Sequence, residues 1–227
     1  EEARDRALVY LFAYSGARSA EVLRDPNDSR RIGVTWADVD PEAGVIRVLG
    51  KSQTAGEEVQ LPSQARPAVE RYRRILDPPT EEWPVFPTRH APSLYECARS
   101  ELSERVDGLE SELEANGPEA VLRRYEIPPP SITTETVRNI FRRLCKEGEI
   151  PVEGEHEYLK PHGARRGAGE ALYRAEGASA AQRALRHEDP STTSKMYSHI
   201  EASEQADVAS DAFEKIDEQT TTEDDVS

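Results

Sequence analysis

Apolar residues recur at helical spacing over most of the chain and alternate with polar residues in only one short interval. Near the start, Leu8, Leu11 and Phe12 share one face of a predicted helix, which ends at the pair Ser15-Gly16. This spacing of three and four residues places the three side chains on a single stripe that packs into a core. The first segment therefore predicts an amphipathic helix.

A second, shorter helix and a small sheet are expected next. Ser19 is the predicted N-cap of this helix, and Glu21 lies in its first turn, where a carboxylate suits the helix dipole. Alternating positions with turn sequences between them then predict three short antiparallel strands, in residues 34–40, 44–51 and 57–62. Helices return after the strands, in residues 63–76, 131–148, 162–177, 179–187 and 191–200. The pattern predicts an α+β fold that is mainly α-helical.

An insertion over residues 88–130 interrupts this pattern. It contains the stripe Leu102, Val106, Leu109 and Leu113, whose alternating spacing of four and three is typical of a coiled-coil strand. One helix turning into a second at the sequence "ANGPEA" would form a protruding hairpin, which makes residues 94–125 a candidate surface for a protein partner. The alternative, which we favour, is that the stripe packs on its own domain.

Composition narrows the class of protein. Among 227 residues, 36% are hydrophobic and 32% are charged, and no run approaches the roughly 18 apolar residues of a membrane span, so we expect a soluble, cytoplasmic protein with no membrane partner. The start lacks the order of a secretory signal, and Met196 is the only methionine, so we expect a domain cut from a longer protein. Cys97 and Cys145 lack the spacing of metal ligands, so the sequence predicts neither a metal nor another cofactor.

The net charge of −15 argues against nucleic-acid binding unless it is unevenly distributed. Residues 201–227 form an acidic tail with ten acidic residues and one lysine, whereas residues 137–200 are slightly basic. Basic residues are also almost all arginine, with only five lysines in the chain. This composition favours a halophilic origin, where salt screens repulsion within about 3 Å at 1 M. Ordinary acidic composition is the open alternative.

Several reactive side chains follow one another in a distinctive order. The chain offers "YSGARSAEVL", then a sheet ending in "VLGK", then "HGAR", and finally "LRHEDPSTTSKMY". His162 and Arg165 are three residues apart and so share a helical face, but a single pair of this kind is common on helix surfaces. It is the order of all these residues that is specific.

This order resembles the catalytic domain of the tyrosine recombinase, or phage integrase, family. The resemblance covers residues 3 to about 200, except the insertion and the tail. Gly16 and Arg18 match the glycine-x-arginine that family members carry ahead of a helix, and Glu21 is expected to support the site by orienting an arginine. The six matching reactive positions are Arg18, Lys51, His162, Arg165, His187 and Tyr197.

The resemblance implies a metal-free reaction through a covalent 3′-phosphotyrosyl intermediate. Arg18 and Arg165 would bind the non-bridging phosphate oxygens, because guanidinium forks bind such oxygens and keep their proton. His162 would accept the proton of the Tyr197 hydroxyl, whose reference pKa near 10 leaves it protonated at neutral pH. Lys51 would protonate the departing 5′ oxygen as general acid. His187 would donate a hydrogen bond to the phosphate.

Two departures from the family pattern stand out. Arg186 occupies the position where the family usually has a glycine before its histidine, which puts the placing of His187 in question. The turn "SQTAG" replaces a more basic turn after Lys51. Arg166, beside Arg165, is expected to contact phosphate rather than to catalyse, and Arg186 is a candidate second DNA contact.

The leading hypothesis is a site-specific recombinase, with residues 1–200 as its catalytic domain. By resemblance, full-length members clamp double-stranded DNA with a further N-terminal helical domain, which we expect to be absent here, and four protomers act together on two sites. A degenerate member that only binds DNA or a protein is the alternative, which the net charge and Arg186 favour. A type IB topoisomerase shares the chemistry but fits the short chain less well.

Overall fold

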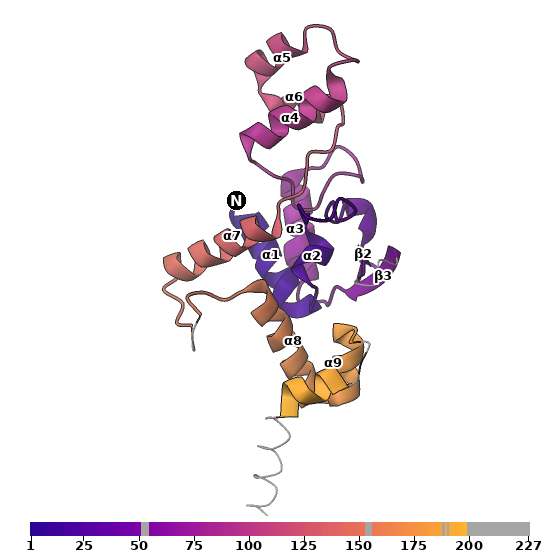
Figure 1. The fold of residues 1–227 in the computed structure, drawn as a ribbon, viewed down its shortest axis with the longest axis vertical. Coiled ribbons are helices and arrows are strands. Elements are labelled where there is room, and N and C mark those ends of the chain that lie inside the picture. The colour runs from indigo at the N-terminus through magenta and orange to yellow at the C-terminus, as the bar shows by residue number, and fades with distance from the viewer. Residues whose placement is uncertain (51–54, 153–155, 188, 190, 199–227) are drawn as a thin grey trace, which may run out of the picture. The chain divides into compact units, whose positions relative to one another are not determined.

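The fold is mainly helical with one small antiparallel sheet, as the sequence pattern predicts (Figure 1). A computed structural model describes residues 1–50, 55–152, 156–187, 189 and 191–198. The chain divides into two compact units, Glu1–Ala168 and Gly169–Ser227, and each is considered by itself. Within the described residues, no helix combines the length and the apolar character needed to cross a membrane.

Helix α1, Glu2–Ser15, confirms the first predicted helix. Leu8, Leu11 and Phe12 are fully buried in the core of the first unit. Gly16 ends the helix with a φ of 63°, a left-handed conformation that a residue without a Cβ adopts at little cost. The apolar stripe and the glycine stop together explain both the position and the end of α1.

Helix α2, Ser19–Val22, begins at the predicted place but with a different cap. Arg18, rather than Ser19, is the N-cap residue. The reason is local, because the carboxylate of Glu21 accepts a hydrogen bond from the backbone N–H of Arg18 at 2.9 Å. The acidic residue in the first turn therefore closes the helix start, and the hydroxyl of Ser19 is not needed for capping.

The sheet has the order β1-β2-β3 and is antiparallel throughout. Its strands are β1 (Val39–Asp40), β2 (Val45–Leu49) and β3 (Ala55–Gln60). The expected strand over residues 34–40 is wrong in most of its length, because Trp36–Asp38 form a 3₁₀ turn, η1. The Asp38 carboxylate accepts hydrogen bonds from the N–H and the hydroxyl of Thr35, at 2.8 and 3.0 Å, which favours the turn.

Helix α3, Arg66–Leu76, packs against α1, and the chain then runs through turns, bends and isolated bridges to the insertion. The two ends of the insertion are hydrogen-bonded to each other. The N–H of Thr88 donates to the carbonyl of Pro130 at 2.8 Å, and the N–H of Ile132 donates to the carbonyl of Phe86 at 2.8 Å. The chain segments that enter and leave the insertion therefore lie side by side and are hydrogen-bonded to each other.

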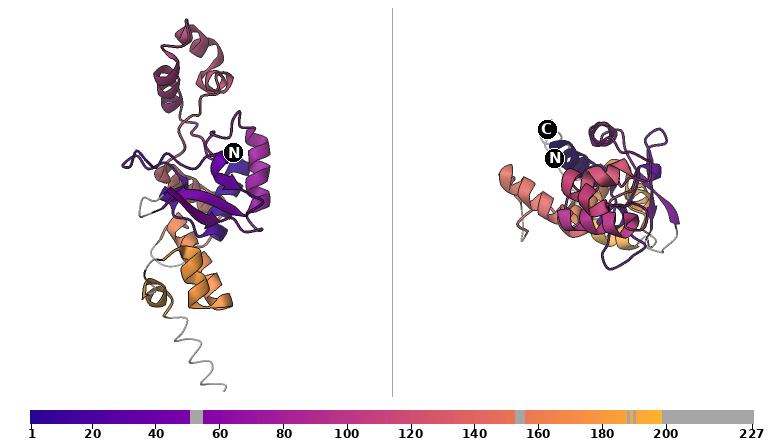
Figure 2. Two further views of the ribbon diagram at one scale, coloured as in Figure 1. Left: turned by 90° about the vertical axis from the view of Figure 1, so that its right-hand side faces the viewer. Right: turned by 90° about the horizontal axis from the view of Figure 1, so that it is seen from above.

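The insertion is helical but is not a two-helix hairpin. Its three helices, packed against one another in Figures 1 and 2, are α4 (Ala91–Leu102), α5 (Leu109–Asn116) and α6 (Pro118–Arg124). The predicted continuous helix is broken before Gly108, which has a φ of 74°. Within the stripe, Leu102, Leu109 and Leu113 are buried and Val106 packs partly against the same core. The stripe is thus used inside the protein and is not a free partner surface.

Helix α7, Thr134–Glu147, is the predicted capped helix. The side chain of Thr133 accepts a hydrogen bond from the N–H of Thr136 at 3.2 Å, which satisfies one of the open donors of the first turn. Val137, Ile140 and Phe141 are buried as expected, together with Cys145. Leu144, also expected inward, is partly buried against the core.

The last helices are α8 (Pro161–Glu176), α9 (Ala178–Leu185) and a helical segment over residues 191–198. Gly177, with a φ of 81°, separates α8 from α9, so the predicted stop is confirmed. The second unit has a small core of its own, made of Tyr173, Ala181, Leu185 and Tyr197. Helix α8 begins in the first unit and ends in the second.

Gly33 provides a test of how tightly the loop before the sheet is packed. It has a φ of 92°, and an added Cβ would lie 2.6 Å from the Cβ of Ser131. We expect Gly33→Ala to lower the free energy of unfolding by about 2 kcal/mol, from left-handed strain plus overpacking. Urea unfolding followed by circular dichroism measures this change.

The matched control is Gly108→Ala, because Gly108 also has a positive φ but open space around it. This variant should carry only the backbone cost of about 1 kcal/mol. Equal losses in the two variants would contradict the steric part of the explanation.

Candidate functional site

The turn between α1 and α2 presents the first predicted site residue. The guanidinium of Arg18 is held by Glu21, with 2.7 Å between Nη1 and a carboxylate oxygen. The Glu21 side chain is 1% exposed and that of Arg18 is 32% exposed, so a buried carboxylate supports an arginine that still reaches solvent. The supporting role of Glu21 in a reaction stays a prediction.

Arg165 lies on α8 and is 4% exposed. Its Nη1 donates a short hydrogen bond to the carbonyl oxygen of Gly16, the residue that ends α1. A buried guanidinium without acceptors would be costly, so this carbonyl is an important partner. The same turn therefore carries Arg18 and anchors Arg165, which brings the two arginines of the predicted site into one region of the first unit.

His162 begins the same helix one turn earlier, and its side chain is exposed. Its pKa is lowered from the usual value, first because the imidazole is partly desolvated and then because the guanidinium groups of Arg165, Arg166 and Arg18 oppose a further positive charge. The neutral form is favoured, and a neutral imidazole can accept a proton. His162 thus shares one electrostatic environment with the predicted phosphate-binding arginines.

Lys51, the predicted general acid, lies outside the described residues. The last described positions before it are Leu49, which ends β2, and Gly50.

In the second unit, His187 follows the end of α9. Its Nδ1 lies 2.8 Å from the hydroxyl of Thr193, which is 1% exposed. The backbone N–H of His187 donates to the carbonyl of Gln182 at 3.1 Å, and the Gln182 side chain donates back to the carbonyl of His187 at 3.2 Å. These contacts fix both the backbone and the ring of the histidine.

Tyr197 lies in the helical segment 191–198 and is 2% exposed. Its ring is tilted against that of Tyr173, with 5.2 Å between centroids, and its hydroxyl lies so close to Gly169 of α8 that an added Cβ there would collide with it. Asp189 caps the start of the segment, because its carboxylate accepts from the N–H of Ser191 at 2.8 Å. The hydroxyl and the backbone N–H of Ser191 both donate to this carboxylate and lower the pKa of Asp189.

Arg186 occupies the C-cap of α9 in the left-handed conformation, with φ 53° and ψ 48°. Glycine is the usual residue at such a cap, because it has no Cβ to clash in the left-handed conformation. Arg186 adopts the same backbone at a cost of about 1 kcal/mol. The departure in sequence therefore leaves the turn before His187 intact.

Sequence reasoning missed the groups that hold these side chains. The carbonyl of Gly16 and the hydroxyl of Thr193 are ordinary in sequence, and no motif marks them as partners of Arg165 and His187. Arg31 was also missed, although it binds the end of β2. The one feature that could have drawn attention to Arg31 is the arginine pair Arg30-Arg31, which lies in a predicted loop and has no role in any motif.

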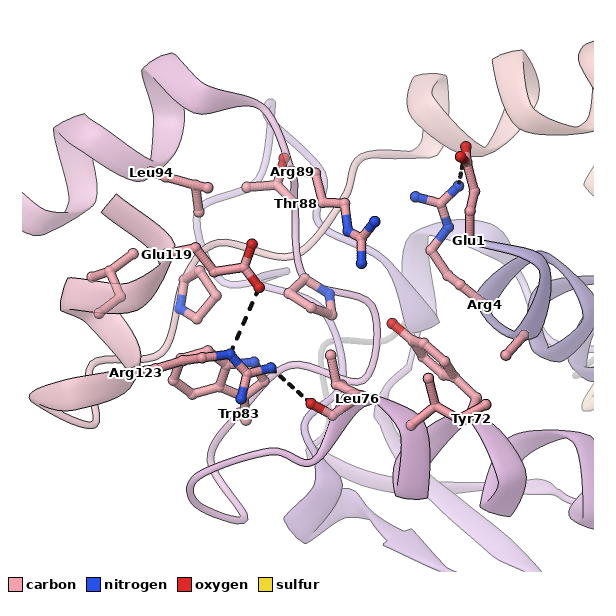
Figure 3. A pocket seen from close by; sticks show the side chains of 15 residues that line it. Glu1, Arg4, Tyr72, Leu76, Trp83, Thr88, Arg89, Leu94, Glu119 and Arg123 are labelled. Atoms are coloured by element: carbon pink, nitrogen blue, oxygen red, sulfur yellow. Dashed lines mark hydrogen bonds and ion pairs between the residues drawn. The ribbon is translucent and has the colours of Figure 1, made fainter. Parts of the chain in front are cut away.

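A pocket of about 60 Å³ lies elsewhere in the first unit, between α1, α3 and the insertion (Figure 3). The Tyr72 hydroxyl and the guanidinium groups of Arg4 and Arg89 face it. Burial raises the pKa of Tyr72 to about 12, so its hydroxyl stays protonated. No predicted site residue lines this pocket.

Two of the three arginines that line the pocket already have protein acceptors. Arg4 donates to the carboxylate of Asp5 at 2.7 Å, and Arg123 donates to the backbone carbonyl of Leu76 at 2.7 Å. Arg123 also lies over the ring of Trp83, 5.5 Å from its centroid. The contacts of Arg123 join the insertion to the rest of the unit, so we interpret the pocket as part of the packing between them.

The chain was compared with known proteins. The model of the phage integrase family matches residues 1–204. Among solved structures, XerA recombinase has a TM-score of 0.55 at 18% identity, and the match covers 86% of this chain and 53% of that one. XerH site-specific recombinase, bound to a palindromic difH substrate in a post-cleavage complex, has a TM-score of 0.56 at 16% identity, with 92% and 45% covered. No curated protein sequence matches the chain.

Because the two solved structures are only 18% and 16% identical to this chain, they support its fold alone. The chain spans about half the length of each of them.

The surroundings of His162 predict how the pKa of its imidazole responds to a nearby charge. We expect its pKa in the free protein to lie below 6.5 and to move upward in Arg166→Gln, which removes one of the positive charges that oppose protonation. Nuclear magnetic resonance of the imidazole protons over pH 4–8 measures both values. Arg138→Gln is the control, because Arg138 is exposed and pairs with Glu135. An unchanged or lower pKa in Arg166→Gln would contradict the electrostatic account.

The close approach of Tyr197 to α8 predicts that Gly169→Ala is destabilising. The added methyl group collides with the end of a rigid ring, so we expect a loss of about 1–3 kcal/mol, typical of overpacking. Gly167→Ala, two residues earlier on the same helix, has open space and should instead stabilise by up to about 1 kcal/mol. Thermal unfolding compares the two, and the same sign of change for both would refute the contact.

Proposed function

Because the chain belongs to the phage integrase family, we propose that it is the catalytic domain of a site-specific tyrosine recombinase that cleaves and rejoins DNA. The observation that carries the proposal is the arrangement of Arg18, His162 and Arg165 around the turn at Gly16. Two guanidinium groups and a neutral imidazole in one region are the groups that a phosphodiester reaction needs.

Arg18 and Arg165 bind the non-bridging oxygens of the scissile phosphate in this proposal. Charge builds on these oxygens as the fifth bond to phosphorus forms, and preorganised donors stabilise it. Arg18 also lies at the start of α2, although so short a helix adds little to anion binding. Glu21 keeps the Arg18 fork in place, and His187 donates to the same phosphate, from Nε2 because Nδ1 faces Thr193.

Two proton transfers complete the cleavage step. The hydroxyl of Tyr197 gives its proton to His162 as its oxygen bonds to phosphorus, and the bond from phosphorus to the 5′ oxygen breaks while Lys51 protonates that oxygen. The lowered pKa of His162 supports this assignment, since the base must begin neutral. The deep burial of Tyr197 requires that the side chains covering it move before a phosphate reaches the hydroxyl.

The 3′-phosphotyrosyl link conserves the energy of the broken bond. A second DNA end can therefore reverse the step by attacking the link, which distinguishes recombination from hydrolysis. XerH, described as a site-specific recombinase bound to a palindromic difH substrate in a post-cleavage complex, supports our proposal that the substrate is double-stranded DNA. We propose that four protomers act together, with residues 1–200 as the catalytic domain, 88–130 as an insertion and 201–227 as an acidic tail.

The acidic composition is compatible with this function if salt screens the repulsion from DNA. Arg166 and Arg186 are then added DNA contacts, and a salt-rich cytoplasm remains our prediction for the setting of the protein. A degenerate member that only binds DNA or a partner protein is the second candidate. The net charge of −15 favours it over the enzyme, because acidic surfaces repel the phosphates on which a recombinase must act.

Formation of a covalent adduct separates the two candidates. A pool of nicked duplexes with randomised sequence is incubated with the protein, and DNA that stays attached under denaturing conditions is recovered and sequenced. On the selected site, we expect the wild type to form a slower-migrating band in a denaturing gel and Tyr197→Phe to form none. Tyr173→Phe is the matched control, because it removes the hydroxyl of the neighbouring ring. Absence of any wild-type adduct, including in a longer form of the chain, would contradict the recombinase.

The arginines give a graded result in the same assay. We expect Arg18→Ala to lower the rate of adduct formation by on the order of 10²–10³-fold, the usual effect of losing one such donor. Arg18→Lys should recover little of this loss, since lysine lacks the planar fork. A rate within threefold of wild type for either variant would remove Arg18 from the proposed site.

A further inference from the structure

The pocket between α1, α3 and the insertion contains a buried polar group that the packing around it leaves unsatisfied. The hydroxyl of Tyr72 points toward the guanidinium groups of Arg4 and Arg89 (Figure 3). Tyr72 is 6% exposed, and its hydroxyl makes no hydrogen bond to any residue that the structure describes. Because a buried hydroxyl is costly without a partner, this one indicates that a ligand or water supplies the partner.

Two guanidinium groups add donors to the same space. Arg4 binds Asp5 through Nε and Nη2, and within the described part of the chain its Nη1 has no hydrogen-bonding partner. The Arg89 side chain is exposed and forms neither a hydrogen bond nor an ion pair with a described residue. Burial raises the pKa of Tyr72, and the charges of Arg4 and Arg89 oppose this rise, so both guanidinium groups act on one hydroxyl.

The acidic side chains of the pocket are already paired. Glu1 lies 3.4 Å from Nη2 of Arg4, and Glu119 lies 3.6 Å from Nε of Arg123. Three arginines and two glutamates line the pocket, which gives its lining a net charge of +1 in a chain whose net charge is −15. The unpaired donors therefore face a locally positive space, which favours an anion.

The volume of the pocket limits the size of that anion. A cavity needs about 10–15 Å³ to hold one water. The 60 Å³ of this pocket therefore has room for a few waters or for one small oxyanion, but not for a nucleotide. Guanidinium groups bind oxyanions well, because their planar N–H donors match pairs of oxygen atoms and keep their charge.

We propose that this pocket binds one free oxyanion of the phosphate or sulfate class. Arg89 and Nη1 of Arg4 donate to its oxygens, and the hydroxyl of Tyr72 donates a third hydrogen bond. Because Arg4 belongs to α1 and Arg89 directly precedes the cap of α4, the bound anion connects the domain to the start of the insertion. The site uses none of the six reactive positions and does not depend on the proposed recombinase reaction.

Calorimetric titration of the full chain with sodium phosphate tests the proposal. At pH 7, with sodium chloride holding the ionic strength constant, we expect saturable binding for which sodium sulfate competes. Arg89→Gln and Tyr72→Phe should each weaken this binding about tenfold or more, because each removes a donor to a charged ligand. Urea unfolding in chloride should show no loss of stability in either variant, since the groups removed have no partner among the described residues.

A control variant and a second measurement locate the bound phosphate. Arg105→Gln removes the charge of an exposed arginine that belongs to the same insertion but does not line the pocket, and it should bind phosphate like the wild type. Hydrogen exchange followed by mass spectrometry should show slower exchange in α1 and in residues 86–94 when phosphate replaces chloride. Phosphate bound at the candidate functional site would respond to neither Arg89→Gln nor Tyr72→Phe.

Four results would overturn the proposal. An unchanged affinity in Arg89→Gln or in Tyr72→Phe would place any bound phosphate elsewhere, and so would exchange that phosphate leaves unaltered in α1 and in residues 86–94. Binding that chloride abolishes at equal concentration would show an adventitious ion only. A short DNA duplex should bind the wild type and Arg89→Gln alike, and a duplex affinity that falls as far as the phosphate affinity would assign Arg89 to a DNA contact instead.

Discussion

The contact between the buried guanidinium of Arg165 and the carbonyl of Gly16 is the interaction on which the first unit's candidate site depends. The two residues are 149 positions apart, so this bond joins the beginning of the chain to α8. It satisfies a charge that would otherwise be costly to bury, and it does so with a backbone atom that is exposed for bonding only because α1 ends there.

Helix ends perform most of the positioning in both units. The carboxylate of Glu21 caps α2 and holds Arg18, and Asp189 caps the segment that carries Tyr197. Arg186 closes α9 in a left-handed turn just before His187. Hydrogen bonds at these helix ends therefore fix the backbone around Arg18 and His187. The helices hold the backbone rigid, and the contacts at their ends orient the side chains that lie there.

Hydrophobic periodicity predicted most helices, because apolar residues three and four positions apart lie on one face of a helix and that face can be buried. It failed where a polar contact or a glycine overruled the pattern. Asp38 turned a predicted strand into a 3₁₀ turn, and the break before Gly108 divided a predicted long helix although its leucines remained buried. In both places the apolar residues are where the pattern put them, but the backbone between them follows a different course.

The sequence by itself determined which reactive side chains the chain carries and in what order, and that order was specific enough to indicate a family. Only the tertiary structure decided their partners, because nothing in the sequence marks the carbonyl of Gly16, the hydroxyl of Thr193 or the side chain of Arg31 as a hydrogen-bonding partner. A motif records the groups that meet the substrate. The backbone carbonyls and hydroxyls that hold those groups are present in every chain, and only folding selects which of them come within hydrogen-bonding distance.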